Sequence, residues 1–265
     1  MKATVRREQI LHLIRMQNRV DVSELAGLFG VCMETIRRDL EILEKNHEVK
    51  KIHGGAMKPK TYTMEEYLFE ARVGERAGEK DEIAKVAASY IKNGDVVALE
   101  SGTTVLAVVP YLKDKDITIV TNSIPVMNLI VSQKLMNLSG KIIFLGGEFN
   151  RRSVSVYGEL SIQMLEKIHI SKSFLSSQGF TVDEGLTNYN MRESIFARTL
   201  INRSEKSFLL LDSSKVNKDS FYTIASADKV DVIISTAPAP QRFWSKVPNT
   251  AWVQVPTSKA TVKPQ

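Results

Sequence analysis

Short apolar runs alternate with amphipathic stretches from about residue 81 onward, and this alternation restricts the fold more than any other feature of the chain. Five runs are short enough to be buried strands: 96–99, 117–121, 141–147, 207–212 and 230–235. Between them lie helical stretches that include 104–112, 125–135 and 190–203. A repeat of strand, helix and strand favours a mainly parallel sheet covered on both faces. The sequence therefore predicts an α/β domain over residues 80–265, whose proline-rich tail after Thr236 packs loosely.

The first sixty residues have a different, helical pattern. Apolar side chains recur at helical spacing in three successive stretches, at about 4–17, 22–30 and 34–46. Asp21 and Glu24 form a capping-box pattern at the start of the second stretch, and Gly30 suits a left-handed cap at its end. Because only a few residues separate the second and third stretches, they form a helix-turn-helix. We expect a head at 1–58 and a charged linker at 59–79.

The third helix carries two adjacent arginines within the stretch ETIRRDL. Its apolar residues Ile36 and Leu40 are spaced i, i+4, so burying them turns Thr35, Arg37 and Arg38 outward. These are positions from which a helix in the major groove reaches bases and phosphates. The pattern favours a DNA-reading helix.

A basic segment, NHEVKKIHGGA at 46–56, follows this helix. It has the pattern of a short β-hairpin wing whose Lys50 and Lys51 approach the DNA backbone. The first sixty residues hold 12 Lys+Arg against 8 Asp+Glu, so most of the net charge of +6 lies there. The alternative is a solvated face on which the arginines pair with Glu34 and Glu41. The predicted DNA contacts are Thr35, Arg37, Arg38, Lys50, Lys51 and His53.

Polar and glycine residues follow several of the predicted strands. Since ligands of such sheets bind at the carboxyl ends of the strands, these residues are candidates for holding an anionic small molecule. A lysine near another strand end adds a positive charge. Ordinary helix caps and turns use the same residue types, which is the alternative for any single loop. The candidate effector-binding residues are Ser101, Gly102, Thr103, Thr104, Thr121, Asn122, Ser123, Gly146, Gly147 and Lys215.

The head resembles the winged helix-turn-helix of the DeoR family of bacterial transcriptional regulators along nearly all of residues 5–56. The motifs that carry this resemblance are TIRRDL and the downstream HGGA. One departure lies in the turn, where Cys32 stands in place of the small hydroxyl residue usual in the family. A thiol is a poor hydrogen-bonding substitute for a hydroxyl, and a small buried thiol is the expected role for Cys32.

Residues from about 80 to 236 resemble the sensor domain of the same family. The motifs GDVVALESGTT, TNS, LGGEFN, DEGLTN and LLLDSSK occur in the family's order. The resemblance implies a fold shared with sugar-phosphate isomerases and a phosphorylated sugar or related metabolite as effector. It also implies that SGTT binds the phosphate, with Asn122, Gly147 and Lys215 near the sugar. Two departures could change the effector: Glu100 replaces a frequent aspartate, and ISKSFLSSQGF lacks an acidic residue.

The resulting hypothesis is a cytoplasmic DNA-binding regulator, a repressor of a carbohydrate-utilisation operon, that acts as at least a dimer (a dimer or tetramer). Its expected partners are double-stranded operator DNA and a phosphorylated sugar, with no membrane, metal or cofactor and no enzymatic activity. A single cysteine and four histidines show no metal-ligand spacing, and no apolar run could span a membrane. The alternative is a sugar-phosphate isomerase or deaminase with an appended helical domain, for which Asp183 and Glu184 are candidate acids.

Overall fold

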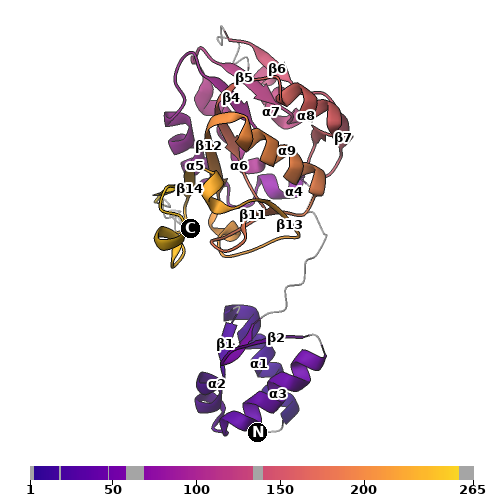
Figure 1. Ribbon diagram of the computed structural model, residues 1–265, viewed down its shortest axis with the longest axis vertical. Coiled ribbons are helices and arrows are strands. Elements are labelled where there is room, and N and C mark those ends of the chain that lie inside the picture. The colour runs from indigo at the N-terminus through magenta and orange to yellow at the C-terminus, as the bar shows by residue number, and fades with distance from the viewer. Residues whose placement is uncertain (1–2, 18, 47, 58–68, 134–139, 257–265) are drawn as a thin grey trace, which may run out of the picture. The chain divides into compact units, whose positions relative to one another are not determined.

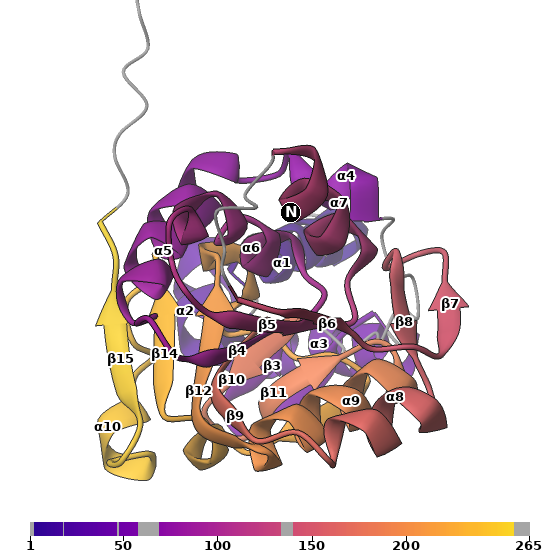
Figure 2. The same cartoon turned by 90° about the horizontal axis from the view of Figure 1, so that it is seen from above.

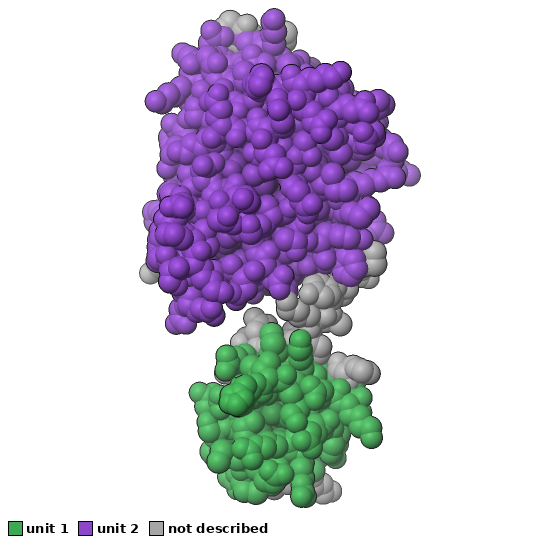
Figure 3. All heavy atoms as spheres, in the orientation of Figure 1, with its two compact units in different colours: residues 1–62 green, residues 63–265 purple. Residues whose placement is uncertain are grey.

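The computed structural model describes residues 3–17, 19–46, 48–57, 69–133 and 140–256. The chain divides into two compact units, Met1–Tyr62 and Thr63–Gln265, coloured separately in Figure 3. The first part of the predicted linker, up to residue 68, lies outside the described residues.

The smaller unit, or head, contains three helices and a small sheet (Figure 1). The helices are α1 (Ala3–Gln17), α2 (Val22–Phe29) and α3 (Met33–Lys45). The strands are β1 (Arg19–Asp21), β2 (Lys50–Ile52) and β3 (Gly55–Met57). β3 lies between β1 and β2 and pairs antiparallel with both. The predicted hairpin wing is therefore present, and β1 adds a third strand that the pattern did not predict.

Local sequence explains how the head is assembled. The side chain of Asp21 accepts a hydrogen bond from the N–H of Ser23 and so caps α2. Gly30 ends α2 at φ 62°, the left-handed conformation predicted for it. Gly55 is required because a Cβ there would lie 2.1 Å from the carbonyl oxygen of Val20. The wing can therefore pack against β1 only with glycine at this position.

Seven strands form the central sheet of the larger unit, in the order β15-β14-β12-β9-β4-β5-β6. All neighbouring pairs are parallel. The bounds in that order are Ala251–Gln254, Val232–Ser235, Ser204–Leu211, Ile170–Leu175, Val96–Leu99, Thr118–Thr121 and Ile142–Phe144. From β4 the chain proceeds through β5 to β6 in one direction and from β9 to β15 in the other. The strand order thus reverses between β4 and β9, where ligands of open α/β sheets bind.

Helices cover both faces of this sheet, as Figure 2 shows for the view from above. One face carries α5 (Ala77–Ser89), α6 (Thr103–Leu106) and α7 (Ile124–Ser132), and the other carries α8 (Glu159–Leu165) and α9 (Met191–Asn202). Phe174 and Phe208 belong to the core on the first face, where their rings stack at 4.7 Å between centroids. Phe196 and Leu165 belong to the core on the second face. The predicted parallel sheet with two covered faces is confirmed.

Shorter elements complete the unit. The helical ones are α4 (Phe69–Val73), α10 (Phe243–Lys246) and the 3-10 turns η1 (Val109–Leu112), η2 (Ser213–Lys215) and η3 (Ala227–Lys229). β7 (Glu148–Asn150) and β8 (Ser155–Tyr157) form a hairpin. β10 (Gly179–Thr181), β11 (Gly185–Asn188) and β13 (Tyr222–Ala225) form an antiparallel sheet beyond the ends of β9 and β12.

Three details differ from the sequence prediction. The stretch 104–112 is divided into α6 and η1, with Pro110 in the first turn of η1. The five apolar runs that predicted strands do not include β9, because Lys172 and Ser173 interrupt the apolar residues of this strand. The prediction of a loosely packed tail is wrong for residues up to 256, because α10 and β15 pack on the sheet edge and bury Phe243 and Trp252.

Candidate DNA interface and effector pocket

The outward face of α3 carries the predicted DNA contacts. Ile36 and Leu40 are buried, at 0% and 1% exposure, and they pack in the core of the head. The side chains of Arg37 and Arg38 are 56% and 77% exposed, while Thr35 is half-buried. The spacing of the apolar residues therefore positions both guanidinium groups on the surface, as predicted.

Both arginines lie near Glu34 on the same helix. Arg37 Nη1 is 3.3 Å from one carboxylate oxygen of Glu34, and Arg38 Nε is 4.0 Å from the other. Ion pairs between such exposed groups contribute about 0–1 kcal/mol. Either guanidinium can therefore leave Glu34 for a phosphate or a base edge at little cost. The alternative pairing expected from the sequence is thus present for Glu34, yet it is too weak to fix the arginines.

The wing adds cations next to α3. Lys50 and His53 are exposed, whereas Lys51 is half-buried and its ammonium lies 3.0 Å from Glu41. A hollow between α3 and the wing is lined by Arg37, Lys51 and His53 among others. The head thus brings Arg37 of α3 and Lys51 of the wing to one hollow beside α3.

A buried ion pair, which the sequence did not reveal, holds α3 against α1. Arg6 Nε donates to Asp39 at 2.6 Å, and Arg7 Nε is 3.6 Å from the other carboxylate oxygen. Asp39 is 4% exposed and Arg6 is 7% exposed. Asp39 follows Arg38 directly, so the residue next to the exposed arginine pair anchors α3 to α1 on the opposite face of the helix.

Cys32 does not fit the expectation of a buried thiol, because it is exposed at the N-cap of α3. Its sulfur is 3.2 Å from the hydroxyl of Thr35, and this hydrogen bond lowers the pKa of the thiol. The side chain makes no hydrogen bond to the amides of the first turn. The cap contact that a hydroxyl residue supplies is therefore missing, as its weaker hydrogen bonding predicts.

The larger unit has a pocket at the carboxyl ends of β4, β9 and β12, where the strand order reverses. We call it the strand-end pocket. Of the predicted effector residues, Thr103, Thr104 and Lys215 line it. The other lining residues are Arg72, Glu75, Arg76, Lys80, Ser176, Ser177, Gln178, Leu210, Asp212 and Ser214.

Four of these residues are cations, and two of them are held by single polar contacts inside the protein. Lys80, only 5% exposed, donates to the carbonyl oxygen of Arg72, and Lys215 donates to Gln178 Oε1 at 2.9 Å. Burial lowers the pKa of both lysines. Nε of Arg72 is buried and has no hydrogen-bond partner among the described residues. The lining also contains the acids Glu75 and Asp212, so the four cations exceed the two acids by two positive charges. Because an excess of buried positive charge is costly, the pocket favours an anion.

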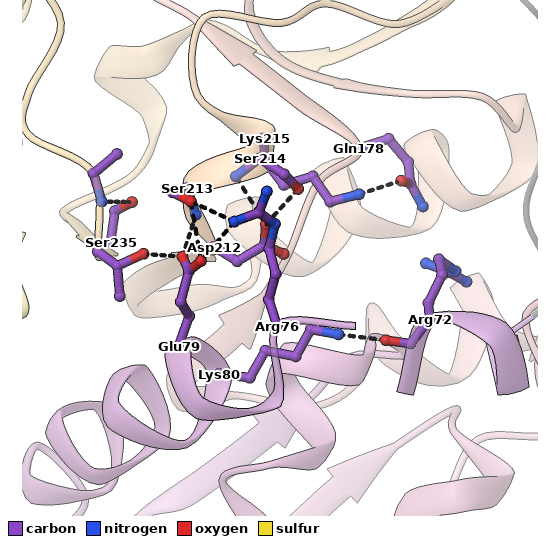
Figure 4. A network of polar contacts seen from close by, with 12 residues as sticks. Arg72, Arg76, Glu79, Lys80, Gln178, Asp212, Ser213, Ser214, Lys215 and Ser235 are labelled. Carbon is purple, nitrogen blue, oxygen red and sulfur yellow. Dashed lines mark hydrogen bonds and ion pairs between the residues drawn. The ribbon is translucent and has the colours of Figure 1, made fainter. Parts of the chain in front are cut away.

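A network around Glu79 joins the start of α5 to the ends of β12 and β14 (Figure 4). Glu79 accepts hydrogen bonds from Arg76 at 2.7 Å, from the N–H of Ser213 at 2.9 Å and from the hydroxyl of Thr236. Burial alone would raise the pKa of Glu79, but these hydrogen bonds outweigh it and lower the pKa to about 2. The carboxylate therefore fixes the segment that carries Arg76 and Lys80.

Replacing Glu79 with glutamine should destabilise the larger unit by roughly 1.5–3 kcal/mol, the range for hydrogen bonds to a charged group. Because folding lowers this pKa from 4.5 to about 2, the ionised carboxylate stabilises the fold above pH 4.5. That stabilisation is lost as the pH falls toward 2. Melting curves of both proteins against pH should therefore converge near pH 2. A constant difference would show that the charge of Glu79 is not responsible.

The other predicted effector residues lie elsewhere at the strand ends. Ser101 donates to or accepts from the hydroxyl of Tyr157, and Gly102 packs so closely that a Cβ would be 2.5 Å from Ser176 Oγ. Thr121 donates to the carbonyl oxygen of Leu99 at 2.7 Å, beside the pocket rather than in it.

Asn122, Ser123, Gly146 and Gly147 make contacts within the fold and do not line the strand-end pocket. Ser123 caps α7, and Asn122 Nδ2 donates to the carbonyl oxygen of Val156 at 3.1 Å. The carbonyl of Gly146 accepts from Ser161, and Gly147 has φ 145°. Ser123 therefore has a cap role and Gly147 a turn role, whereas Oδ1 of Asn122 is buried with no hydrogen-bond partner among the described residues.

The residues that sequence reasoning missed are Arg72, Arg76 and Lys80, which lie within or next to the predicted linker. The recurrence of a cation every four residues from 72 to 80 was the signal that could have revealed them. The candidate acids of the enzyme alternative lie in the exposed turn between β10 and β11, where Asp183 pairs with Lys246. Neither Asp183 nor Glu184 lines the strand-end pocket.

Comparison with known proteins agrees with this architecture. A family model described as the DeoR-like helix-turn-helix domain matches residues 6–61, and one described as the DeoR C terminal sensor domain matches residues 75–237. The chain belongs to the DeoR family. An uncharacterized HTH-type transcriptional regulator of Bacillus subtilis, YulB, is 35% identical over 89% of both chains. The lactose phosphotransferase system repressor of Staphylococcus epidermidis is 30% identical over 87% of this chain and 90% of its own.

Among solved structures, ribose 5-phosphate isomerase A from Methanocaldococcus jannaschii matches 52% of this chain and 53% of its own. Its sequence identity is 14% and its TM-score is 0.38, so the likeness concerns the α/β fold alone. As a member of the DeoR family, the chain is a DNA-binding transcriptional regulator. No helix within the described residues has the length and apolar character needed to cross a bilayer.

Proposed function

We propose that this DeoR-family protein represses a carbohydrate-utilisation operon and that a phosphorylated sugar bound in the strand-end pocket controls it. The observation that supports the effector class most directly is the convergence of Arg72, Arg76, Lys80 and Lys215 on one pocket where the strand order reverses. A phosphate group would supply a negative charge that matches these cations. Relatives that are themselves named repressors support the direction of control.

Control by the effector requires that it bind the DNA-competent and DNA-incompetent arrangements of the protein with different affinities. The protein acts as at least a dimer, because a two-fold operator presents two half-sites and one small head makes few contacts. On this proposal Thr35, Arg37, Arg38, Lys50, Lys51 and His53 contact operator DNA. The phosphate contacts are Arg72, Arg76, Lys80, Thr103, Thr104 and Lys215.

The pocket is tested by titrating the full-length chain with inorganic phosphate and with fructose 6-phosphate, glucose 6-phosphate, galactose 6-phosphate and ribose 5-phosphate. Lys80→Met and Lys215→Met should each weaken phosphate binding by roughly tenfold, the loss expected when one charged hydrogen bond is removed. Lys229→Met is the matched control, because Lys229 is 62% exposed and lies outside the pocket. Equal weakening in all three variants would indicate nonspecific charge attraction instead.

On the same proposal the protein is a regulator that binds sugar phosphates and does not convert them into products. Incubation with the four sugar phosphates should release no isomerised product above the uncatalysed rate. Specific turnover that is lost in Lys215→Met would instead establish an enzyme that uses this pocket.

A further inference from the structure

A second hollow adjoins the strand-end pocket and has a different charge. It shares Arg72 and residues 176–178 with that pocket. Its other lining residues are Phe69, Glu100, Ser101, Ser153, Asn188 and Glu193. We call this hollow the acidic chamber, because two carboxyl groups face it. A molecule with its phosphate among the four cations can therefore extend into a region of opposite character.

The two carboxyl groups of the chamber are bonded differently, although Glu100 and Glu193 are 3% and 6% exposed. Glu193 accepts hydrogen bonds from the side-chain amides of Asn150 at 3.3 Å and Asn188 at 3.2 Å, which favour its charged form. Glu100 accepts a long hydrogen bond, 3.4 Å, from the N–H of Ser176. Burial, and then the nearby charge of Glu193, raise the pKa of Glu100 well above its usual range. Of the two carboxyl groups, Glu100 is therefore the one that keeps its proton to higher pH.

We propose that the acidic chamber reads the hydroxyl groups of the phosphorylated sugar, with Glu100 donating a hydrogen bond and Glu193 accepting one. This inference rests on the proposed function of the strand-end pocket. A sugar hydroxyl both donates and accepts, so one protonated and one ionised carboxyl match it. Arg72 lies at the boundary, and its unpartnered Nε can serve the phosphate or the first hydroxyl.

The charge of the chamber determines whether it prefers a neutral sugar phosphate or an amino sugar phosphate. Arg72 is shared with the strand-end pocket, so its guanidinium faces both the phosphate and the chamber. An ammonium group would be favoured most strongly if both carboxyls were ionised. A neutral hydroxyl therefore fits the chamber better than an amine.

The experiment measures the dissociation constants of inorganic phosphate and of the four sugar monophosphates for the full-length protein by calorimetry. We expect at least one sugar phosphate to bind more tightly than inorganic phosphate, and Glu193→Gln to reduce that advantage by roughly tenfold or more. The control is Glu166→Gln, because Glu166 is exposed and outside both pockets. The Glu166→Gln protein should bind that sugar phosphate more tightly than inorganic phosphate by the same factor as the wild-type protein.

The outcomes separate this inference from the proposed function. If phosphate binds but no sugar phosphate exceeds it, or if Glu193→Gln keeps the full advantage, the chamber does not read hydroxyls. If neither phosphate nor any sugar phosphate binds, the proposed function itself fails. A tenfold preference for glucosamine 6-phosphate over glucose 6-phosphate would also overturn the assignment of a donor and an acceptor.

The pH dependence tests the protonated state of Glu100. The titratable groups near Glu100 are Glu193 on α9, Tyr157 on β8 and Arg72 on α4, and burial raises the pKa of Tyr157. Since Glu100 donates only below its raised pKa, the advantage of the sugar phosphate over inorganic phosphate should fall as the pH rises through it. Glu100→Gln keeps a permanent N–H donor, so it should retain the advantage and show only the pH dependence that the ionisation of the ligands' own phosphate groups causes. Equal pH dependence in the wild-type and Glu100→Gln proteins would contradict the inference.

Discussion

Replacing Arg37 and Arg38 together with alanine should weaken operator binding by about 1–3 kcal/mol for each base contact that is lost, which is about 5- to 150-fold in affinity per contact. The reason is that α3 buries its apolar face and presents both guanidinium groups outward. The measurement is a gel shift or anisotropy titration with DNA from the promoter of the protein's own gene. Its salt dependence should also become shallower, because fewer phosphates are neutralised.

Glu34→Gln provides the matched control for this experiment. It removes the acid that both arginines contact, so DNA affinity should stay the same or rise. Because these side chains are exposed, neither variant should change the free energy of unfolding by more than about 0.5 kcal/mol. An unchanged affinity in the double-alanine protein would show that α3 does not enter the groove as we infer.

Replacing Asp39 with alanine should unfold or strongly destabilise the head. The change leaves the buried guanidinium of Arg6 without its partner, and breaking a buried pair in this way costs about 3–5 kcal/mol. A unit of this size has little stability to spare, since whole domains have only about 5–15 kcal/mol. The Asp39→Ala protein should therefore lose DNA binding together with the helical structure of the head. The double-alanine variant of Arg37 and Arg38 should lose DNA affinity while its head stays folded.

Spectroscopy can assign this loss to the head. Both tryptophans, Trp244 and Trp252, lie in the larger unit, so their fluorescence reports that unit alone. We expect Asp39→Ala to leave the tryptophan transition in place and to speed hydrogen exchange in α1 and α3. Glu41→Ala is the control on the same helix, since its exposed side chain pairs only with Lys51 among the contacts described. Slow exchange in the Asp39→Ala head would mean that the buried pair is dispensable.

The sequence predicted those parts of the fold in which burial follows a local period. The recognition helix is one example, because Ile36 and Leu40 alone determine which way Arg37 and Arg38 point. The strand at 96–99 is another, since all four of its residues are apolar. A polar residue inside a strand hides it, as Lys172 does in β9, where it pairs with Asp95.

The pocket was harder to predict because its cations are buried by distant parts of the chain. Lys80 lies in a charge-dense stretch that is typical of an exposed linker, yet tertiary packing leaves it 5% exposed. Its neighbours Asp212 and Ser214 come from the end of β12, and no local period relates them to it. The prolines after Thr236 likewise suggested a loosely packed tail. The apolar side chains of Phe243 and Trp252 in this tail are instead buried in the core at the edge of the sheet.

The hydrogen bond between Lys80 and Arg72 has one consequence for ligand binding. Within the described residues of the larger unit α4 is the first element, and the ammonium of Lys80 donates to the carbonyl oxygen of Arg72 in this helix. An anion that bound the ammonium would compete with that carbonyl oxygen. Occupation of the strand-end pocket and the position of α4 are therefore coupled through one side chain.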